Sequence, residues 1–116
     1  MAAPNIVNVT SITGKTAVLA VTTSASAIVT CGANKVLKVN GLFVTNVSAS
    51  SSGIVTIDIY RGGTARHFAK SVGIPVGEML DVLGTKSLYL EENDFLRLTA
   101  NANSVIEAVC TYEEIA

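Results

Sequence analysis

The sequence has little of what most enzymes and nucleic-acid binders depend on. It contains no tryptophan, aromatic residues make up only 5% of the chain, and there is a single histidine, His67. Scarce aromatics remove the stacking platforms on which single-stranded nucleic acid is usually bound. The formal net charge of −1 gives no broad attraction for a polyanion. We therefore expect no nucleic-acid partner.

Long apolar runs are also absent. No stretch of about 18 apolar residues occurs, so we expect no membrane-spanning helix and no membrane partner. Residues 1–10 lack a basic segment followed by an apolar one, so no secretory signal is expected. Cys31 and Cys110 lie in apolar, strand-like contexts, where a free thiol behaves as a small buried hydrophobe. A disulfide between them is the less favoured alternative, because a reducing compartment rarely permits one.

Charged residues are scarce as well. They make up 15% of the 116 residues, against roughly 25% in an average soluble domain, while the hydrophobic fraction is 49%. A chain of this length folds as one domain with a real core, yet it has few charges to cover its surface. Monomers seldom expose large apolar patches. We therefore expect part of the surface to pack on another subunit, in a homo-oligomer such as a trimer or dimer.

What the sequence does contain is a period-two alternation of apolar and polar residues. In residues 53–61, Val55, Ile57 and Ile59 share one face, as in a strand with one buried side. Turn-forming residues separate such segments roughly every eight to twelve residues, and no helix is predicted. The expected strand segments are residues 16–22, 27–31, 35–47, 53–61, 65–74, 78–83, 86–100 and 104–112. This spacing predicts an all-β fold, a β-sandwich (jelly-roll or Ig-like) of about eight short antiparallel strands.

Local signals divide the chain further. Residues 1–13 are expected to form an N-terminal arm with a weak edge strand, and residues 14–116 a single β-sandwich domain, after a turn at Gly14 and Lys15. Gly41 predicts a bulge within residues 35–47, a strand in which Val39 and Phe43 are expected to share a face. Residues 62–63, both glycine, predict a hairpin turn. Residues 91–94 predict an acidic corner between two strands within residues 86–100.

No catalytic or metal-binding pattern stands out. His67 has no carboxylate beside it on its strand to orient an imidazole, so a nucleophilic triad is not expected. One histidine and two distant cysteines do not make a zinc site. The acidic corner lacks an EF-hand pattern, and a solvated corner is favoured over a calcium site. Asp58 and Glu107 are a weak candidate pair for acid–base chemistry. We therefore predict no enzymatic activity, catalytic residue, metal or cofactor.

Candidate interaction residues fall into two groups. Arg61, Arg66 and Lys70, on either side of the predicted hairpin turn, form a basic cluster. It is suited to an acidic partner, such as the acidic corner of a neighbouring subunit, although a solvated face is the simpler interpretation. The N-terminal arm is expected to reach a neighbour. The predicted interface residues are Asn5, Ile6, Arg61, Arg66, Lys70, Glu91 and Glu92. Three dispersed tyrosines, Tyr60, Tyr89 and Tyr112, suggest a sugar-binding surface only weakly.

A longer pattern carries a resemblance. An Asn-containing strand at residues 44–47 precedes VTIDIY, followed by IPVG, then LYLEENDFLRLTA, and a closing strand at residues 109–114. In this layout, residues 36–115 resemble small virion structural proteins of tailed bacteriophages, particularly of marine and cyanobacterial phages. The pattern consists of hydrophobic strands and corners and contains no catalytic signature.

The resemblance implies a β-sandwich component of a virion that binds other copies or other virion proteins. The leading hypothesis is a non-enzymatic capsid decoration or cement protein, made in the host bacterial cytoplasm, whose partner is the major capsid protein. The alternative is a tail, neck or fibre component that acts as a receptor- or carbohydrate-binding module.

Overall fold

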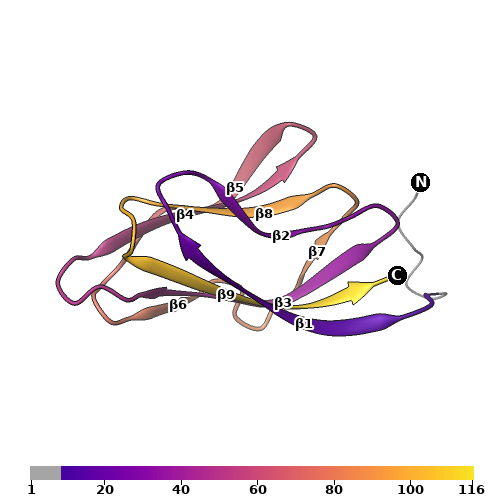
Figure 1. Ribbon diagram of the computed structural model, residues 1–116, viewed down its shortest axis with the longest axis horizontal. Coiled ribbons are helices and arrows are strands. Elements are labelled where there is room, and N and C mark those ends of the chain that lie inside the picture. Colours follow the sequence, from indigo (N-terminus) through magenta and orange to yellow (C-terminus); the bar gives the residue numbers. More distant parts are fainter. Residues whose placement is uncertain (1–8) are drawn as a thin grey trace.

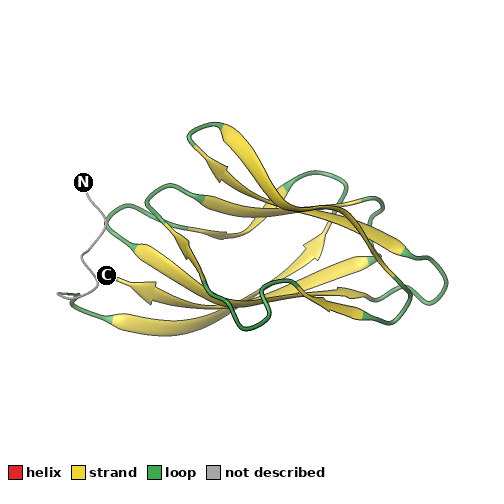
Figure 2. Cartoon of the chain, turned by 180° about the vertical axis from the view of Figure 1, so that it is seen from behind, coloured by secondary structure: helices red, strands yellow, loops and turns green. Residues whose placement is uncertain are grey.

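The computed structural model describes residues 9–116, which form nine strands in two sheets packed face to face (Figures 1 and 2). Every strand pairing within the sheets is antiparallel. The strands are β1 (Ile12–Val21), β2 (Ser26–Thr30), β3 (Val36–Asn46), β4 (Gly53–Arg61), β5 (Thr64–Ile74), β6 (Met79–Asp81), β7 (Leu88–Leu90), β8 (Phe95–Ala100) and β9 (Ile106–Ile115). The prediction of an all-β sandwich is confirmed.

The strand order is that of a jelly roll. Sheet A has the order β1-β9-β3-β6, with β7 also paired to β3, and sheet B has the order β2-β8-β4-β5. The short strands β6 and β7 occupy one strand position, because they pair with opposite ends of β3. The pairs β1·β9, β2·β8, β3·β6/β7 and β4·β5 are then nested, as in a ribbon wound around a barrel. This order resolves the choice between a jelly roll and an Ig-like sandwich.

The inner faces of the two sheets make the core. Sheet A contributes side chains such as Leu42 and Val44, and sheet B contributes Val55, Ile57 and Leu98, each of them fully buried. Alternation explains this placement, since every second residue of a strand points to the same side. The period-two assignments for residues 53–61, 86–100 and 104–112 are therefore confirmed.

The strand β3 has a bulge where Gly41 predicted one. Its register against β9 shifts between Val39 and Gly41. The extra residue, Asn40, reverses the alternation, so that Val39 points to the core together with Leu42. The expectation that Val39 shares a face with Phe43 is wrong for this reason.

The start of the domain also differs from expectation. β1 runs without interruption from Ile12 to Val21, and its register with β9 has no shift. Gly14 and Lys15 are therefore paired strand residues, and the predicted turn there is wrong. Ile12 and Thr13, which the sequence assigned to the arm, belong to β1. Residues 1–8 lie outside the described residues.

Two connections position the surfaces discussed below. Gly62 and Gly63 have φ values of 59° and 80°, which a tight hairpin turn between β4 and β5 requires, and the predicted hairpin is confirmed. Asn46, at the end of β3, is 1% exposed and donates hydrogen bonds to the carbonyl oxygens of Ser51 and Ile74 at 2.8 and 2.9 Å. It thereby ties sheet A to the start and end of the β4–β5 pair.

Candidate assembly surfaces

Sheet A turns one face to the core and one face away from sheet B. On the outward face, the register places Val18 of β1, Val109 of β9 and Phe43 of β3 side by side across three strands. Val18 is 74% exposed and Val109 is 37% exposed; Met79 of β6, on the same face, is 58% exposed. We call Val18, Phe43, Met79 and Val109 the outer apolar patch.

Gly41 allows the Phe43 ring to lie against the sheet. A Cβ atom at Gly41 would lie 3.1 Å from Cε2 of Phe43 and 2.9 Å from Oγ1 of Thr111, closer than side chains normally approach. The absent side chain therefore leaves room for the Phe43 ring beside Thr111.

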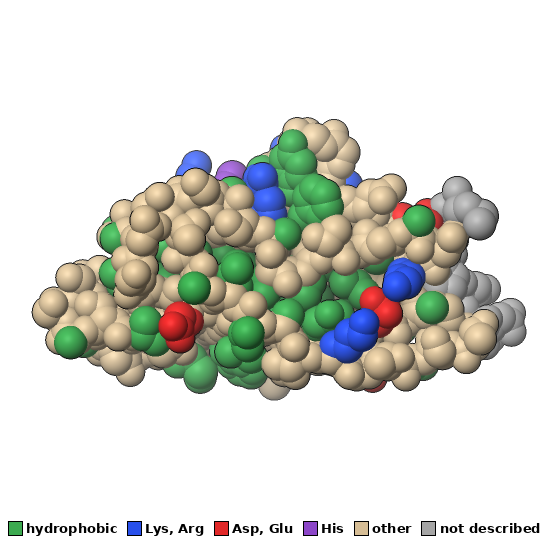
Figure 3. Space-filling view, in the orientation of Figure 1, with side chains coloured by type: hydrophobic (Ala, Val, Ile, Leu, Met, Phe, Trp, Pro, Cys, Tyr) green, Lys and Arg blue, Asp and Glu red, His purple; other side chains and the backbone are tan. Residues whose placement is uncertain are grey.

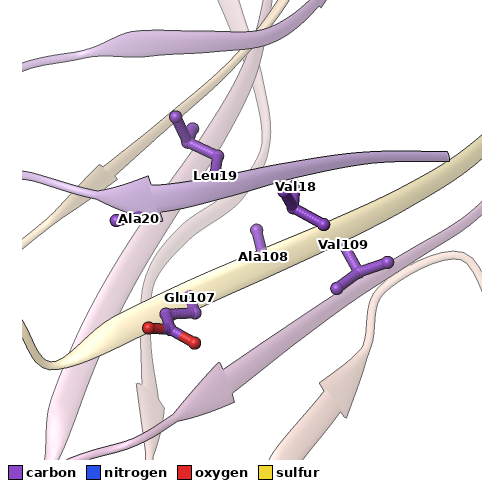
Figure 4. A pocket seen from close by; sticks show the side chains of 6 residues that line it. All are labelled: Val18, Leu19, Ala20, Glu107, Ala108 and Val109. Carbon is purple, nitrogen blue, oxygen red and sulfur yellow. The ribbon is translucent and has the colours of Figure 1, made fainter.

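A hollow of about 260 Å³ runs along β1 and β9 beside the patch. In Figure 4, Val18 and Val109 lie on the outward side of the two strands, while Leu19 points to the opposite side of β1. Among the described residues that line it, Glu107 alone is charged. The hollow is shallow and mostly apolar, which suits an apolar side chain of another protein better than a polar small molecule.

The outward face of sheet B carries a different cluster. Arg97 of β8 donates to Asp58 of β4, with Nε 3.0 Å from Oδ1 and Nη2 3.4 Å from Oδ2. Its guanidinium lies 4.1 Å from the ring centroid of Tyr60, and the rings of Tyr60 and Phe95 stack at 5.9 Å. Asp58 points outward yet is only 2% exposed, and the ion pair with Arg97 offsets the cost of burying its charge.

His67 lies directly opposite Asp58 in the β4–β5 register. No carboxylate flanks His67 along β5, but the neighbouring strand β4 places the Asp58 carboxylate beside it. The hydrogen bonds of Asp58, however, come from Arg97, and none joins Asp58 to His67. The pair therefore lacks the oriented imidazole that a nucleophilic triad requires.

The other chemical candidates do not come together. Asp58 and Glu107 lie on the outward faces of different sheets, so the proposed acid–base pair is wrong. Tyr60 is on the outward face of sheet B, Tyr89 on that of sheet A, and Tyr112 packs against the core. No group of three or more metal-binding side chains occurs within residues 9–116.

The acidic corner is bound within the chain. Arg61, at the end of β4, donates to Asp94 through Nε at 2.8 Å and Nη2 at 2.5 Å, and its Nη2 lies 3.1 Å from Glu91. Asp94 is 1% exposed and also accepts the Glu91 N–H at 2.8 Å. Burial alone would raise the pKa of Asp94, but the hydrogen bonds from Arg61 and Glu91 and the Arg61 charge hold that pKa below its usual value.

The remaining predicted interface residues are dispersed. Arg66 and Lys70 are exposed on β5, and neither forms an ion pair within the described residues. Glu92 accepts the Asn34 N–H, so the corner also holds the turn before β3. Asn5 and Ile6 lie outside the described residues. Their contact with another chain stays a prediction, as does that of the corner and of the basic cluster.

Both cysteines are free thiols in the core. Burial raises the pKa of Cys110 to about 12. Burial also raises the pKa of Cys31, and the nearby charges of Asp94, Glu92 and Glu114 raise it further. A hydrogen bond with the Leu37 backbone lowers this pKa, but by less than burial raises it. Both thiols are therefore protonated near neutral pH and act as small apolar core residues.

No protein-family model matches the sequence, and no curated protein matches it. Among solved structures, a protein of Bacillus endospore appendages, described as a novel family of disulfide-linked pili, is similar with a TM-score of 0.52 and 14% identity; the match covers 90% of this chain and 88% of that one. A pentameric capsid protein from metagenomic phage sequences gives a TM-score of 0.46 and 19% identity over 86% of this chain and 62% of its own. At these identities the first likeness concerns the fold alone, and the second is too low to support an argument.

The outer apolar patch is the site that sequence reasoning missed. Residues 17–21, AVLAV, are apolar at consecutive positions, so alternation does not reveal which of them point outward. The available signal was this excess of apolar residues on both faces of one strand.

Within the described residues, no helix is long and apolar enough to cross a membrane.

Proposed function

We propose that this protein is a non-enzymatic structural component of a tailed-phage virion, and specifically a capsid decoration or cement protein. The observation that carries the proposal is the outer apolar patch on sheet A. The partner of this protein is the major capsid protein. The protein acts by burying its outer apolar patch against the capsid and by joining neighbouring capsid subunits. Its location is then the virion, after synthesis in the host bacterial cytoplasm.

The patch has the properties of a protein-binding surface. Four apolar side chains lie on the outward face of one sheet, and the most exposed, Val18, keeps 74% of its surface accessible. Burial of apolar surface contributes roughly 25 cal/mol per Å², so covering such a patch favours association. Flat, apolar surfaces with few charges at the centre are typical of the cores of protein–protein interfaces.

Two further observations support the proposal. The jelly roll is a fold that viral capsid proteins use, and the endospore-appendage protein shows that a subunit with this fold can assemble into a pilus. Residues 36–115 also resemble small virion proteins of tailed phages. The basic residues Arg66 and Lys70 on β5 lie on the other sheet, where they are accessible to an acidic partner.

The test compares two apolar-to-charged substitutions of equal chemistry. Met79→Lys places a charge in the outer apolar patch, and Phe68→Lys places one at an exposed apolar residue of sheet B, 40% accessible. Binding to capsids stripped of the protein is measured by co-sedimentation. We expect Met79→Lys to weaken binding about tenfold or more and Phe68→Lys to leave it unchanged. Equal binding by both variants, or no binding by the wild type, contradicts the proposal.

A second candidate is a receptor- or carbohydrate-binding module of a tail, neck or fibre. The observation that favours it is the stacked pair Tyr60 and Phe95 on the outward face of sheet B, because aromatic rings pack well against sugar rings. A glycan array probed with the wild type and with Phe95→Ala tests it. A signal that the substitution abolishes would support this candidate, and a blank array would remove it.

A further inference from the structure

The four edges of the two sheets differ in their ability to accept another strand. Sheet A ends in β1 on one side and in the three-residue strands β6 and β7 on the other. Sheet B ends in β2, which has five residues and a register shift, and in β5, whose pairing with β4 shifts twice. Short strands and bulges protect edges against pairing. Among the edge strands within residues 9–116, β1 alone is both long, at ten residues, and regular along its whole length.

The hydrogen bonds at the end of β1 show which of its backbone groups point outward. Ser11 and Ala116 exchange two hydrogen bonds, each 3.0 Å long, and are thus a bonded pair of the antiparallel ladder. Bonded and non-bonded pairs alternate along such a ladder. Since the register with β9 has no shift, every second residue after Ser11 is bonded to β9. The residues whose N–H and C=O groups face the edge of β1 that no strand of residues 9–116 pairs with are Ile12, Gly14, Thr16, Val18 and Ala20.

This edge is also little charged. Lys15 is the single charged residue of β1, and its ammonium lies 3.3 Å from the Glu114 carboxylate. Of the five edge-facing residues, Ile12, Thr16, Val18 and Ala20 have side chains on the outward face of sheet A, where Val18 is part of the outer apolar patch. Figure 3, in the orientation of Figure 1, looks at the side of the sandwich where β1 and β2 lie in front, and it shows hydrophobic side chains across the middle with a few charged ones around them. Beside β5, by contrast, an incoming strand meets Arg66, His67 and Lys70.

We propose that β1 pairs with β1 of a second copy of this chain, antiparallel and about a two-fold axis at Thr16. Centred there, the pairing uses all five edge-facing residues, and each pair exchanges two hydrogen bonds. Thr16 lies opposite Thr16 of the second copy, Val18 opposite Gly14, and Ala20 opposite Ile12. A register centred on Val18 leaves Ile12 and Gly14 without a partner among these five, and so forms fewer bonds.

The side chains fit this register. No atom of the described residues lies within 4 Å of the Cβ position of Gly14, so this part of the chain leaves space there for the Val18 side chain of the second copy. A Thr–Thr pair is a favourable cross-strand neighbour. The two Lys15 side chains lie on a diagonal of about 7–8 Å, and each is paired with its own Glu114, which Lys35 also contacts at 3.4 Å. The two sheets A then form one continuous sheet with a joined outward face.

Proline and cysteine substitutions test the pairing. Thr16→Pro removes an edge-facing N–H and none of the bonds to β9, so we expect a folded monomer where the wild type is a dimer by light scattering. Ala17→Pro removes an N–H bonded to β9 and should lower the thermal midpoint instead. If Thr16→Pro lowers the midpoint as much as Ala17→Pro, the assignment of the edge is wrong and the proposal falls.

Cross-linking tests the register. The Cα atoms of a bonded antiparallel pair are about 5.5 Å apart, within reach of a disulfide, so Thr16→Cys should form a cross-linked dimer under mild oxidation. Val18→Cys is the control, because its two copies are offset by four residues, about 13 Å along the strand. Cross-linking of Val18→Cys in preference to Thr16→Cys overturns the register.

Other species in solution would contradict the pairing. A wild-type monomer up to its solubility limit, a trimer, or a dimer that survives Thr16→Pro overturns the proposal. A dimer lost on deletion of residues 1–5 but kept in Thr16→Pro assigns the contact to the arm and overturns it as well. The pairing does not rest on the proposed function, because capsid binding by Met79→Lys and dimer formation by Thr16→Pro are measured separately.

Discussion

Replacing Asp94 with Asn removes one charge from the best-connected ion pair of the molecule. The carboxylate is 1% exposed and accepts two hydrogen bonds from Arg61 and one from the Glu91 N–H. The Asn side chain still offers one oxygen to the Glu91 N–H, so the loss is confined to Arg61. Hydrogen bonds to charged groups contribute about 1.5–3 kcal/mol each. The Arg61 side chain is 51% exposed and recovers water contacts, which lowers the expected loss to about 2 kcal/mol in total.

The assay is thermal and urea unfolding of wild type and variant at several pH values. At neutral pH, about 2 kcal/mol corresponds to a fall in midpoint of roughly 8 °C for a domain of this size. Because the pKa of Asp94 is lowered by folding, its contribution is fully present above the unfolded pKa of about 3.9 and is lost as pH falls through the folded pKa. The variant does not titrate there, so the difference between the two proteins should shrink below about pH 4.

Glu91→Gln is the matched control. Glu91 contacts the same guanidinium at 3.1 Å, but its side chain is 67% exposed, and we expect a loss of about 0.5 kcal/mol or less. Equal losses in the two variants would refute the reasoning that burial of Asp94 makes the difference. So would a gap between wild type and Asp94→Asn that stays constant from neutral pH to about pH 2.

Three further predictions follow from the core. Ile57→Asp should leave no folded population in circular dichroism, because an unpaired charge replaces a fully buried side chain, at a cost of several kcal/mol; Ile54→Asp, at a 42% exposed position of the same strand, should fold. Asn46→Asp should lower the free energy of unfolding in urea by about 3 kcal/mol, because the donors to Ser51 and Ile74 are lost and a carboxylate faces two carbonyl oxygens. Asn40→Asp, at an exposed position of the same strand, is the control, and an equal loss of stability in the two variants would contradict this reasoning. Cys31 and Cys110 should react with a thiol reagent only after unfolding, because both are buried and the pKa of Cys110 is about 12; rapid labelling of the folded protein would show that the core opens.

The sequence predicted the strands well where apolar residues alternate. In residues 53–61 apolar side chains point inward at every second position, so the period alone defines the inward face. It failed at Gly14 and Lys15, which have the composition of a turn. There the ten-residue pairing with β9, almost a hundred residues away in sequence, determines the conformation, and local propensity does not.

The bulge shows a second limit. Gly41 indicated that a bulge was present, but the side chains on either side of it could be assigned to faces only once the register with β9 was known. The same reason hid the contact between Arg61, the last residue of β4, and Asp94, in the acidic corner 33 residues later. Both the faces of the bulged strand and the Arg61–Asp94 contact depend on pairing between residues far apart in the sequence, which a short segment of sequence does not contain.

The candidate surfaces were predicted less well than the fold. The sequence showed a basic cluster and an acidic corner, and both were proposed to contact a neighbouring subunit. It did not show that Arg61 is bound to Asp94 and Glu91 of its own chain. The outer apolar patch arises from Val18, Phe43, Met79 and Val109 on four strands. Each residue alone resembles an ordinary core residue, and only the folded sheet shows that they point away from the core.

The central position of β9 has a consequence for synthesis. The strand lies between β1 and β3 in sheet A, so β1 has no partner in its own sheet until residues up to Ile115 have been made. A chain that stops before Ile106 leaves sheet A in two separate parts and its apolar inner faces uncovered. Such chains are expected to be insoluble or degraded. The fold therefore acts as a check on completeness, since only chains that contain β9 can present β1 and the outward face of sheet A to a partner.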